Sequence, residues 1–252
     1  MIELGKAFAD PEVVALYRHR PPYPPAVFDR LRALLVDPRV VLDAGCGTGA
    51  LARGLVHDVT RIDAIDPSAA MLAAARRLPN GGDRRIRWQQ APAEDAVLSG
   101  PYGLITCGAS LHWMRPEIAL PRFARALAPG ARVAVVDTEA VREETALRRE
   151  VVEVIVRYSP VKDHFETPEF VDRLVASGLF VLEGMERTAA VPFDQSVEEY
   201  LGFLGSTSSL SRATLGARRD EFVRDLRELF QRHNIDRVRY GLVGYVAWGR
   251  PA

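Results

Sequence analysis

The chain has 252 residues, and its 48% hydrophobic content is enough for the core of one large domain or two small ones. Lys plus Arg equals Asp plus Glu at 33 each, so no overall field attracts nucleic acid or an anionic membrane. Two cysteines and five histidines, without metal-ligand spacing, argue against a disulfide scaffold and against a metal site. Because neither a signal-peptide pattern nor an apolar run of about 18 residues is seen, we expect a cytoplasmic protein.

The first 36 residues predict two helices joined by an extended segment. Asp10 is a helix N-cap residue followed by Pro11, which favours a short helix over residues 11–18. The proline-rich segment 19–25 must be extended, because each proline disfavours helix in the residue before it. A second helix is expected over residues 25–36.

Strand and helix patterns then alternate. Strands are expected from residue 40 and over 59–65, 85–90, 103–107 and 131–137. Helices are expected after a glycine turn to about residue 57, from Ser68 to about residue 79, and over 116–127. This order predicts a doubly wound α/β sheet, in which the carboxyl ends of strands one to four gather at one ligand-binding edge.

The remainder of the chain has a different pattern. Helices are expected over residues 142–158, 168–176, 197–204 and 217–233, and strands over 180–187 and 237–248. A stretch rich in Ser and Thr, residues 205–211, follows the third of these helices. The insertion between the last two strands is long, and loops of this kind are often lids; we expect one over residues 202–211.

The run Val-Val-Leu-Asp-Ala-Gly-Cys-Gly-Thr-Gly-Ala at residues 40–50 is the most informative motif. Its glycines, at 45, 47 and 49, allow a sharp turn and a close approach of the backbone to a ligand, and the following helix offers unpaired N–H groups. Such a turn is typical of nucleotide sites. Both a dinucleotide and S-adenosylmethionine (SAM) are candidates for this one.

The charge near the turn distinguishes the two candidates. Gly45, Gly47 and Ala50 satisfy the G-x-G-x-x-G/A pattern of dinucleotide sites, and Asp66 follows at about the expected spacing of roughly 20 residues. Asp43, however, would oppose a pyrophosphate resting on the helix N-terminus. The same carboxylate would attract the sulfonium and ammonium groups of SAM, so the charge favours the methyl donor.

Several motifs together resemble the class I SAM-dependent methyltransferases over nearly the whole chain. They are Leu-Asp-Ala-Gly-Cys-Gly-Thr-Gly at 42–49, Ile-Asp-Pro-Ser at 65–68 with Met71, Ala-Glu-Asp at 93–95, Ser-Leu-His-Trp at 110–113, and an arm at 17–24 similar to Y-x-x-x-R-P-x-Y-P. The resemblance is to the small-molecule branch typified by trans-aconitate methyltransferase-like enzymes. It implies a Rossmann-like seven-stranded sheet of order 3-2-1-4-5-7-6, with the last strand antiparallel and the donor lying across strands one to four.

The resemblance also implies a role for each matching residue. Gly45 and Gly47 would face the methionine part of the donor, Asp43 its ammonium through water or backbone groups, and Asp66 both ribose hydroxyls. The remaining implied donor-binding residues are Met71 and Ala93 at the adenine, Glu94 at the adenine edge, Pro67, Cys107 and Arg20. The alternatives are a helix N-cap or a solvated turn carboxylate at Asp66 and a core residue at Met71.

The chain departs from the family at two positions. Pro92 stands where an aspartate is common, which shifts adenine recognition onto its neighbours. Gly103 stands where relatives place an aspartate, so we expect altered packing there rather than inactivity. Thr106 replaces the proline that would precede a nucleophilic cysteine, so Cys107 is expected to be a small buried thiol, and nucleobase methylation is not expected.

The acceptor side is predicted at the residues after the fourth strand and on the N-terminal arm. His112 is the candidate catalytic residue, because an imidazole there could deprotonate a hydroxyl or orient a carboxylate; a structural histidine is the alternative. Trp113, Tyr17 and Tyr23 are candidate substrate-binding residues. The guanidinium of Arg20 suits a carboxylate of donor or acceptor, with a solvated surface arm as the alternative.

We therefore expect one methyltransferase domain over residues 1–252, with an arm at 1–38, a SAM-binding core at 39–137 and acceptor-side elements at 138–252. The expected reaction is metal-free, in-line transfer of a methyl group from SAM to a small molecule, at oxygen by family analogy, leaving S-adenosyl-L-homocysteine. Methylation of a small amine, a SAM-binding partner subunit without catalysis, and an NAD-dependent oxidoreductase are the alternatives. The expected oligomeric state is a monomer or a homodimer, and no nucleic-acid or membrane partner is expected.

Overall fold

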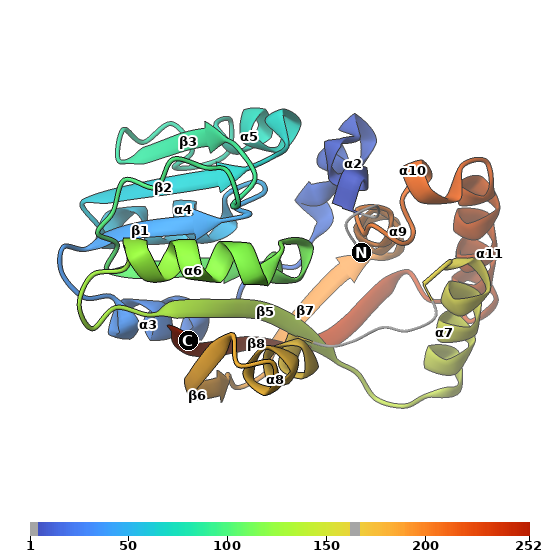
Figure 1. Ribbon diagram of the computed structural model, residues 1–252. Coiled ribbons are helices and arrows are strands. Elements are labelled where there is room, and N and C mark those ends of the chain that lie inside the picture. The colour runs from blue at the N-terminus through green and yellow to red at the C-terminus, as the bar shows by residue number, and fades with distance from the viewer. Residues whose placement is uncertain (1–4, 162–166) are drawn as a thin grey trace. The chain divides into compact units, whose positions relative to one another are not determined.

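The computed structural model describes residues 5–161 and 167–252, and a mixed α/β sheet is its central feature (Figure 1). Its strands are β1 (Val40–Ala44), β2 (Arg61–Asp66), β3 (Ile86–Gln90), β4 (Leu104–Gly108), β5 (Val133–Val141), β6 (Phe180–Arg187), β7 (Val191–Ser196) and β8 (Arg237–Pro251). The sheet order is β3-β2-β1-β4-β5-β8-β6, and β7 pairs with β8 off this path. The pairs from β3 across to β5 are parallel, and β6 and β7 are antiparallel to β8. The Rossmann-like fold class is confirmed.

The helices follow the expected order, with α10 as an unexpected addition before the last one. They are α2 (Pro11–Leu16), α3 (Pro25–Leu34), α4 (Ala50–Leu55), α5 (Ala69–Ala75), α6 (Pro116–Ala126), α7 (Ala146–Tyr158), α8 (Thr167–Ala176), α9 (Val197–Gly205), α10 (Arg212–Leu215) and α11 (Arg218–Arg232). Short 3-10 turns, η1 (Lys6–Ala9), η2 (Tyr17–His19), η3 (Val56–Asp58) and η4 (Leu111–Trp113), complete the described elements.

The chain divides into two compact units. The first, here called the helical unit, comprises Met1–Pro22, Glu139–His164 and Ala190–Val243. The second, the sheet unit, comprises Tyr23–Thr138, Phe165–Ala189 and Gly244–Ala252. β5 and β8 each contribute residues to both units.

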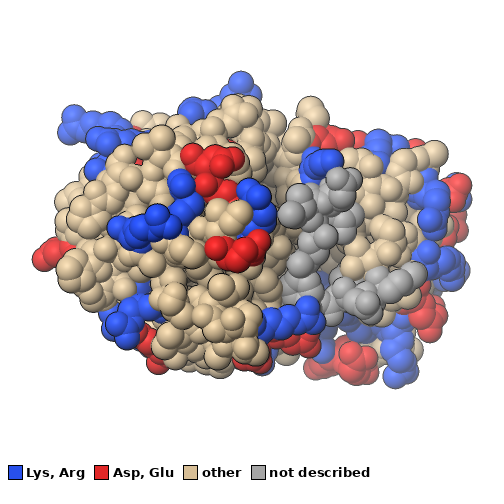
Figure 2. All heavy atoms as spheres, in the orientation of Figure 1, with Lys and Arg blue, Asp and Glu red and all other residues tan. Residues whose placement is uncertain are grey.

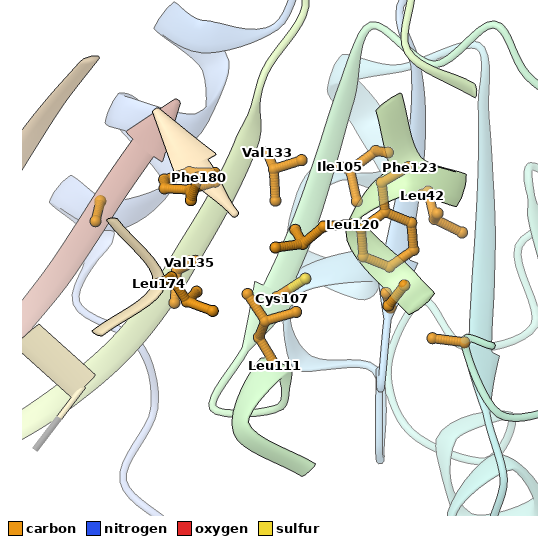
Figure 3. Close-up of a cluster of buried hydrophobic side chains, with 14 of the residues drawn as sticks. Leu42, Ile105, Cys107, Leu111, Leu120, Phe123, Val133, Val135, Leu174 and Phe180 are labelled. Carbon is orange, nitrogen blue, oxygen red and sulfur yellow. The ribbon is translucent and has the colours of Figure 1, made fainter. Parts of the chain in front are cut away.

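The sheet unit is held together by apolar clusters on the two faces of the sheet. Alternate residues of a strand point to opposite faces, so Leu42 joins the cluster covered by α6 and α8, whereas Val41 joins the cluster covered by α3 and α4. Figure 3 shows the first cluster, where Phe123 of α6 lies near Ile105 of β4 and Leu174 of α8 lies near Val135 of β5. Each fully buried side chain of this size contributes about 1.5–3 kcal/mol.

The helical unit has its own core, formed where α7, α9 and α11 pack together. Its buried residues are Val151, Val154, Tyr158, Val197, Tyr200, Leu201, Leu204, Leu210, Leu215, Phe222, Leu226, Leu229 and Phe230. The antiparallel ribbon of β7 and the first part of β8 belongs to the same unit.

The expected number of strands is wrong by one, because the sheet has eight strands rather than seven. The additional strand is β7, which pairs through Pro192 and Gly241 with β8. A proline in so short an apolar run argues against a central strand, and β7 is tolerated because it lies at an edge and pairs only with β8. In the expected order, 3-2-1-4-5-7-6, the last strand lies between the fifth and the sixth. In the structure β8 occupies that position.

Gly103 has a structural reason at the start of β4. A Cβ at this position would lie 2.0 Å from the carbonyl oxygen of Val36, a contact that no side chain can make. The backbone N–H of Gly103 donates to the Val40 carbonyl at 2.8 Å, and its own carbonyl accepts from Val36 N at 3.3 Å. This close backbone approach requires glycine at position 103, and packing altered relative to relatives with an aspartate stays a prediction.

Candidate functional site

The glycine turn after β1 adopts left-handed backbone conformations that glycine allows. The φ angles of Gly45 and Gly47 are +67° and +53°. A Cβ at Gly45 would lie 2.6 Å from the Cβ of Ser110 and 3.2 Å from the methyl group of Met114. The N–H groups of Gly45 and Cys46 both donate to the Ile65 carbonyl, at 2.9 and 3.0 Å, which ties the turn to β2.

Asp66, at the carboxyl end of β2, holds the glycine turn from the other side. One carboxylate oxygen accepts from Gly47 N at 2.8 Å, and the other accepts from Ser68 N at 2.8 Å. The side chain is 9% exposed, and burial raises its pKa although both N–H groups stabilise the charged form. Because each carboxylate oxygen has two lone pairs, each keeps one for a ligand hydroxyl.

Asp43 lies deeper, inside β1. It is 1% exposed and accepts hydrogen bonds from Ala52 N at 3.1 Å and from the Thr106 hydroxyl at 3.0 Å. Burial, with a smaller contribution from the charge of Asp66, raises the pKa of Asp43 to about 7. Burial therefore disfavours the negative charge that the sequence places near a ligand, and Asp43 also fastens α4 to the strand.

The segment after β4 brings the predicted catalytic residue next to aromatic side chains. Ser110 donates to the Ala44 carbonyl at 2.6 Å, which fixes this segment against the end of β1. The ring of His112 lies 4.8 Å from that of Trp113 and 6.1 Å from that of Phe170 in α8. His112 and Trp113 are half-buried and share one aromatic surface of the sheet unit.

The residues predicted at the adenine differ in their exposure. Met71 and Ala93 are buried at 1% and 4% exposure, whereas Pro67 is exposed. Glu94 accepts from the backbone N–H of Arg115 at 2.7 Å and thereby holds the start of α6. A role of Glu94 at a ligand would therefore have to be compatible with this structural contact.

Cys107 points into the apolar cluster near Leu111 and Val135 (Figure 3). It is fully buried, and burial raises the pKa of its thiol well above the ordinary value. A thiol of this kind is not a nucleophile at neutral pH, in agreement with the expected packing role.

The aromatic and basic residues of the N-terminal arm fall into different units. Tyr23 belongs to the sheet unit, and its hydroxyl would lie 2.7 Å from a Cβ on Gly108, at the end of β4. Arg20 and Tyr17 belong to the helical unit. Within it, Arg20 donates to the hydroxyl and carbonyl of Ser206, at 3.0 and 2.9 Å, and its guanidinium lies 4.2 Å from the Tyr17 ring centroid.

The sequence reasoning missed three residues that shape the glycine turn. Thr106 donates to Asp43, Ser110 packs against Gly45, and the Trp88 ring would lie 2.3 Å from a Cβ on Gly49. The signal for Thr106 lies in the register, since parallel pairing of β1 with β4 places Asp43 beside Thr106. That register becomes visible only when the two strands are aligned.

Figure 2 shows side chains of both charge signs interspersed over the face in view. Within residues 5–161 and 167–252, no helix has the length and apolar character needed to cross a bilayer. Across the same ranges, no group of at least three His, Cys, Asp or Glu residues is placed to hold a metal ion.

Comparison with known proteins agrees with this geometry. Residues 41–130 match a family described as "Methyltransferase domain". An uncharacterized methyltransferase of Mycobacterium tuberculosis is 35% identical over 159 residues, which are 62% of this chain and 63% of the relative. A trans-aconitate 2-methyltransferase of Methylobacterium nodulans is 36% identical over 107 residues, which are 41% of this chain and 40% of the relative. The chain thus matches less than two thirds of the length of these curated relatives.

Solved structures share the fold. A structure described as a candidate type II methyltransferase from Anaeromyxobacter dehalogenans has a TM-score of 0.65 at 24% identity, covering 92% of this chain and 97% of the other. A SAM-dependent methyltransferase from Geobacter sulfurreducens, solved with S-adenosyl-L-homocysteine, has a TM-score of 0.52 at 17% identity, covering 91% and 92%. Residues 41–130 thus match a methyltransferase domain, and the chain shares the fold of solved SAM-dependent methyltransferases, the class that the sequence motifs resemble.

Proposed function

We propose that the sheet unit binds SAM at the carboxyl ends of β1 to β4 and that the protein transfers its methyl group to a small molecule. The observation that carries this proposal is the pairing of the glycine turn with Asp66. The turn leaves no side chain at Gly45 or Gly47, and Asp66 keeps a free lone pair on each carboxylate oxygen for two ribose hydroxyls.

The glycine turn and Asp66 support this cofactor, because they leave space and free acceptor lone pairs at the strand ends. Gly45 and Gly47 would face its methionine part, and Asp66 its ribose. Met71 and Ala93 would contact the adenine, and Pro67, Glu94 and Cys107 are the further candidates of the sheet unit. Asp43 would act on the ammonium only indirectly, because it is buried and hydrogen-bonded to Ala52 and Thr106.

SAM supplies a methyl group on a positively charged sulfur, which an acceptor atom displaces in line. The contribution of this chain is then mainly alignment, since holding two reacting atoms about 3–3.5 Å apart supplies much of the acceleration. His112 would accept the proton of an acceptor hydroxyl or orient an acceptor carboxylate, with Trp113 and Tyr23 of the same unit binding the acceptor. The aromatic contacts of His112 with Trp113 and Phe170 support this positioning role.

We assign the acceptor atom to oxygen. Trans-aconitate, the acid in the name of one relative, offers only carboxylate oxygens as heteroatoms. An amine acceptor is the second candidate, because an imidazole at His112 would also take a proton from an ammonium.

Calorimetry of the full chain with SAM, S-adenosyl-L-homocysteine and NADH tests the cofactor. We expect both sulfur compounds to bind and NADH not to bind; NADH binding without affinity for the other two would overturn the proposal. Asp66→Ala should weaken SAM binding at least about tenfold, because it removes two charge-assisted hydrogen bonds. The matched control is Asp83→Ala, which removes a carboxylate paired with Arg85 before β3 and should leave the affinity unchanged.

Transfer of a labelled methyl group from SAM to a metabolite extract tests the enzyme. We expect a labelled product that gains one methyl group as an ester or ether, and a product labelled on nitrogen would contradict the oxygen assignment. His112→Asn should lower kcat at unchanged SAM affinity. If SAM binds but no extract supports transfer, the protein is a SAM-binding subunit without catalysis.

A further inference from the structure

The helical unit contains a pocket of about 460 Å³ between α2, α9 and α11, a size that suits a small organic molecule. Its apolar wall is formed by Leu16, Leu201 and Val223. All of its lining residues belong to the helical unit, and none of them was assigned a role in SAM binding or methyl transfer.

Arg219 of α11 lines this pocket and is buried, with 5% exposure. Its Nη2 donates to the Leu201 carbonyl at 3.1 Å, but its Nε and Nη1 find no acceptor among the described residues. Burial lowers the pKa of Arg219, yet a guanidinium stays charged at neutral pH. Both atoms expose less than 1 Å², so a ligand can accept their hydrogen bonds only if the guanidinium turns toward the pocket. A buried cation with unused donors is costly, and a ligand bound in this way would relieve that cost.

The acidic residues at the pocket do not serve as that ligand, because each is already paired. Arg212 donates to Glu12 at 3.0 Å and to Asp220 at 2.5 Å, and Arg227 donates to both oxygens of Glu198 at 2.7 and 2.9 Å. The exposed fractions of these three carboxylate side chains are 42%, 70% and 66%, so solvent screens their charge. Arg219 is shielded from solvent, and an anion beside it would be screened far less.

Two glycines of α9 make the space for this arrangement. A Cβ on Gly205 would lie 2.4 Å from Nη2 of Arg219, and a Cβ on Gly202 would lie 2.5 Å from the ring of His19. Glycine inside a helix costs up to about 1 kcal/mol relative to alanine, so this face of α9 gives up helix stability to let the Arg219 guanidinium approach it.

We propose that this pocket binds a small organic monocarboxylate, with its carboxylate on Arg219 and its apolar body against Leu16, Leu201 and Val223. The apolar wall favours an organic acid over an inorganic anion, and the pairing of the three pocket carboxylates with Arg212 and Arg227 favours a ligand without an ammonium group. This site is separate from the proposed SAM site, and the inference does not depend on the proposed methyl transfer.

The test measures the binding of three probes to the full chain by calorimetry or ligand-observed NMR. The probes are sodium hexanoate, hexan-1-ol as the matched uncharged compound, and sodium phosphate as an inorganic anion. We expect hexanoate to bind at least about tenfold more tightly than either of the others. Failure of hexanoate to bind, or equal binding of hexanol or phosphate, would overturn the proposal.

Variants locate the binding. Arg219→Met should weaken hexanoate binding about tenfold or more, whereas Arg224→Met, on the exposed side of the same helix, should leave it unchanged. Val223→Trp keeps the buried arginine, fills the pocket and should also abolish binding, so the site remains testable if the arginine variant fails to fold by circular dichroism. Wild-type affinity in Val223→Trp, or in a folded Arg219→Met, would contradict the assignment.

Discussion

The two units differ in how completely their buried charged side chains are hydrogen-bonded. In the sheet unit, each buried carboxylate of the site accepts two hydrogen bonds from its own unit: Asp43 from Ala52 and Thr106, and Asp66 from Gly47 and Ser68. In the helical unit, Arg219 is buried with a single acceptor. A carboxylate with its hydrogen bonds made, such as Asp66, fixes the backbone that surrounds a bound ligand. A guanidinium with unused donors, such as that of Arg219, is itself the group that would bind the ligand.

The strongest test of the sheet unit is Gly45→Val. A branched side chain at φ +67° is strained, and its Cβ would lie 2.6 Å from that of Ser110, so we expect a loss of roughly 3–5 kcal/mol in unfolding free energy. Gly130→Val is the matched control, because Gly130 has φ +78° and nothing within 4 Å of its Cβ position. Chemical denaturation compares the two, and an equal loss in both would mean that the contact with Ser110 carries no cost.

Asp43→Asn tests the buried carboxylate through its pH dependence. The pKa of Asp43 is raised to about 7 from its ordinary value of 3.8, so between these values the folded state binds the proton more tightly than the unfolded state does. Wild-type stability should therefore fall relative to the variant as pH rises from about 4 to 7, by up to about 3 kcal/mol, and level off above that range.

Unfolding curves for both proteins at several pH values check this expectation. Asp95→Asn, at an exposed position of the same unit, is the control that should track the wild type. A wild-type stability that rises relative to Asp43→Asn over this range would show that the hydrogen bonds from Ala52 and Thr106 outweigh the cost of burial.

The sequence predicted those site residues that local spacing brings together, but not those that depend on contacts between distant segments. The glycine turn and Asp66 were predictable because local spacing in the chain places them at adjacent strand ends. The pairing of Thr106 with Asp43 and the use of Glu94 at α6 depend on register between distant segments, which local patterns do not contain. β7 was missed because Pro192 weakened its strand signal.

Arg219 was a different kind of omission, since its signal is periodic. It precedes Phe222 by three residues and Leu226 by seven, so it lies on the apolar stripe of α11. Among the many arginines of this charged helix, position on that stripe distinguishes the one that is buried. An arginine at helical spacing from apolar residues therefore indicates a functional candidate that composition alone conceals.

The smallest expected effect concerns the support of the pocket rather than the pocket itself. Ser196 begins α9 with a capping box, in which its hydroxyl accepts from Glu199 N at 3.2 Å and Glu199 accepts from Ser196 N at 2.7 Å. Ser196→Ala should cost about 1 kcal/mol in unfolding free energy, whereas Ser209→Ala, beyond the same helix, should cost almost nothing. Gly205 and Leu201, whose carbonyl accepts a hydrogen bond from Arg219, both lie beyond the first turn of α9. Fraying of that turn should therefore leave hexanoate affinity nearly unchanged. A large loss of affinity would mean that the pocket forms only when the whole helix is in place.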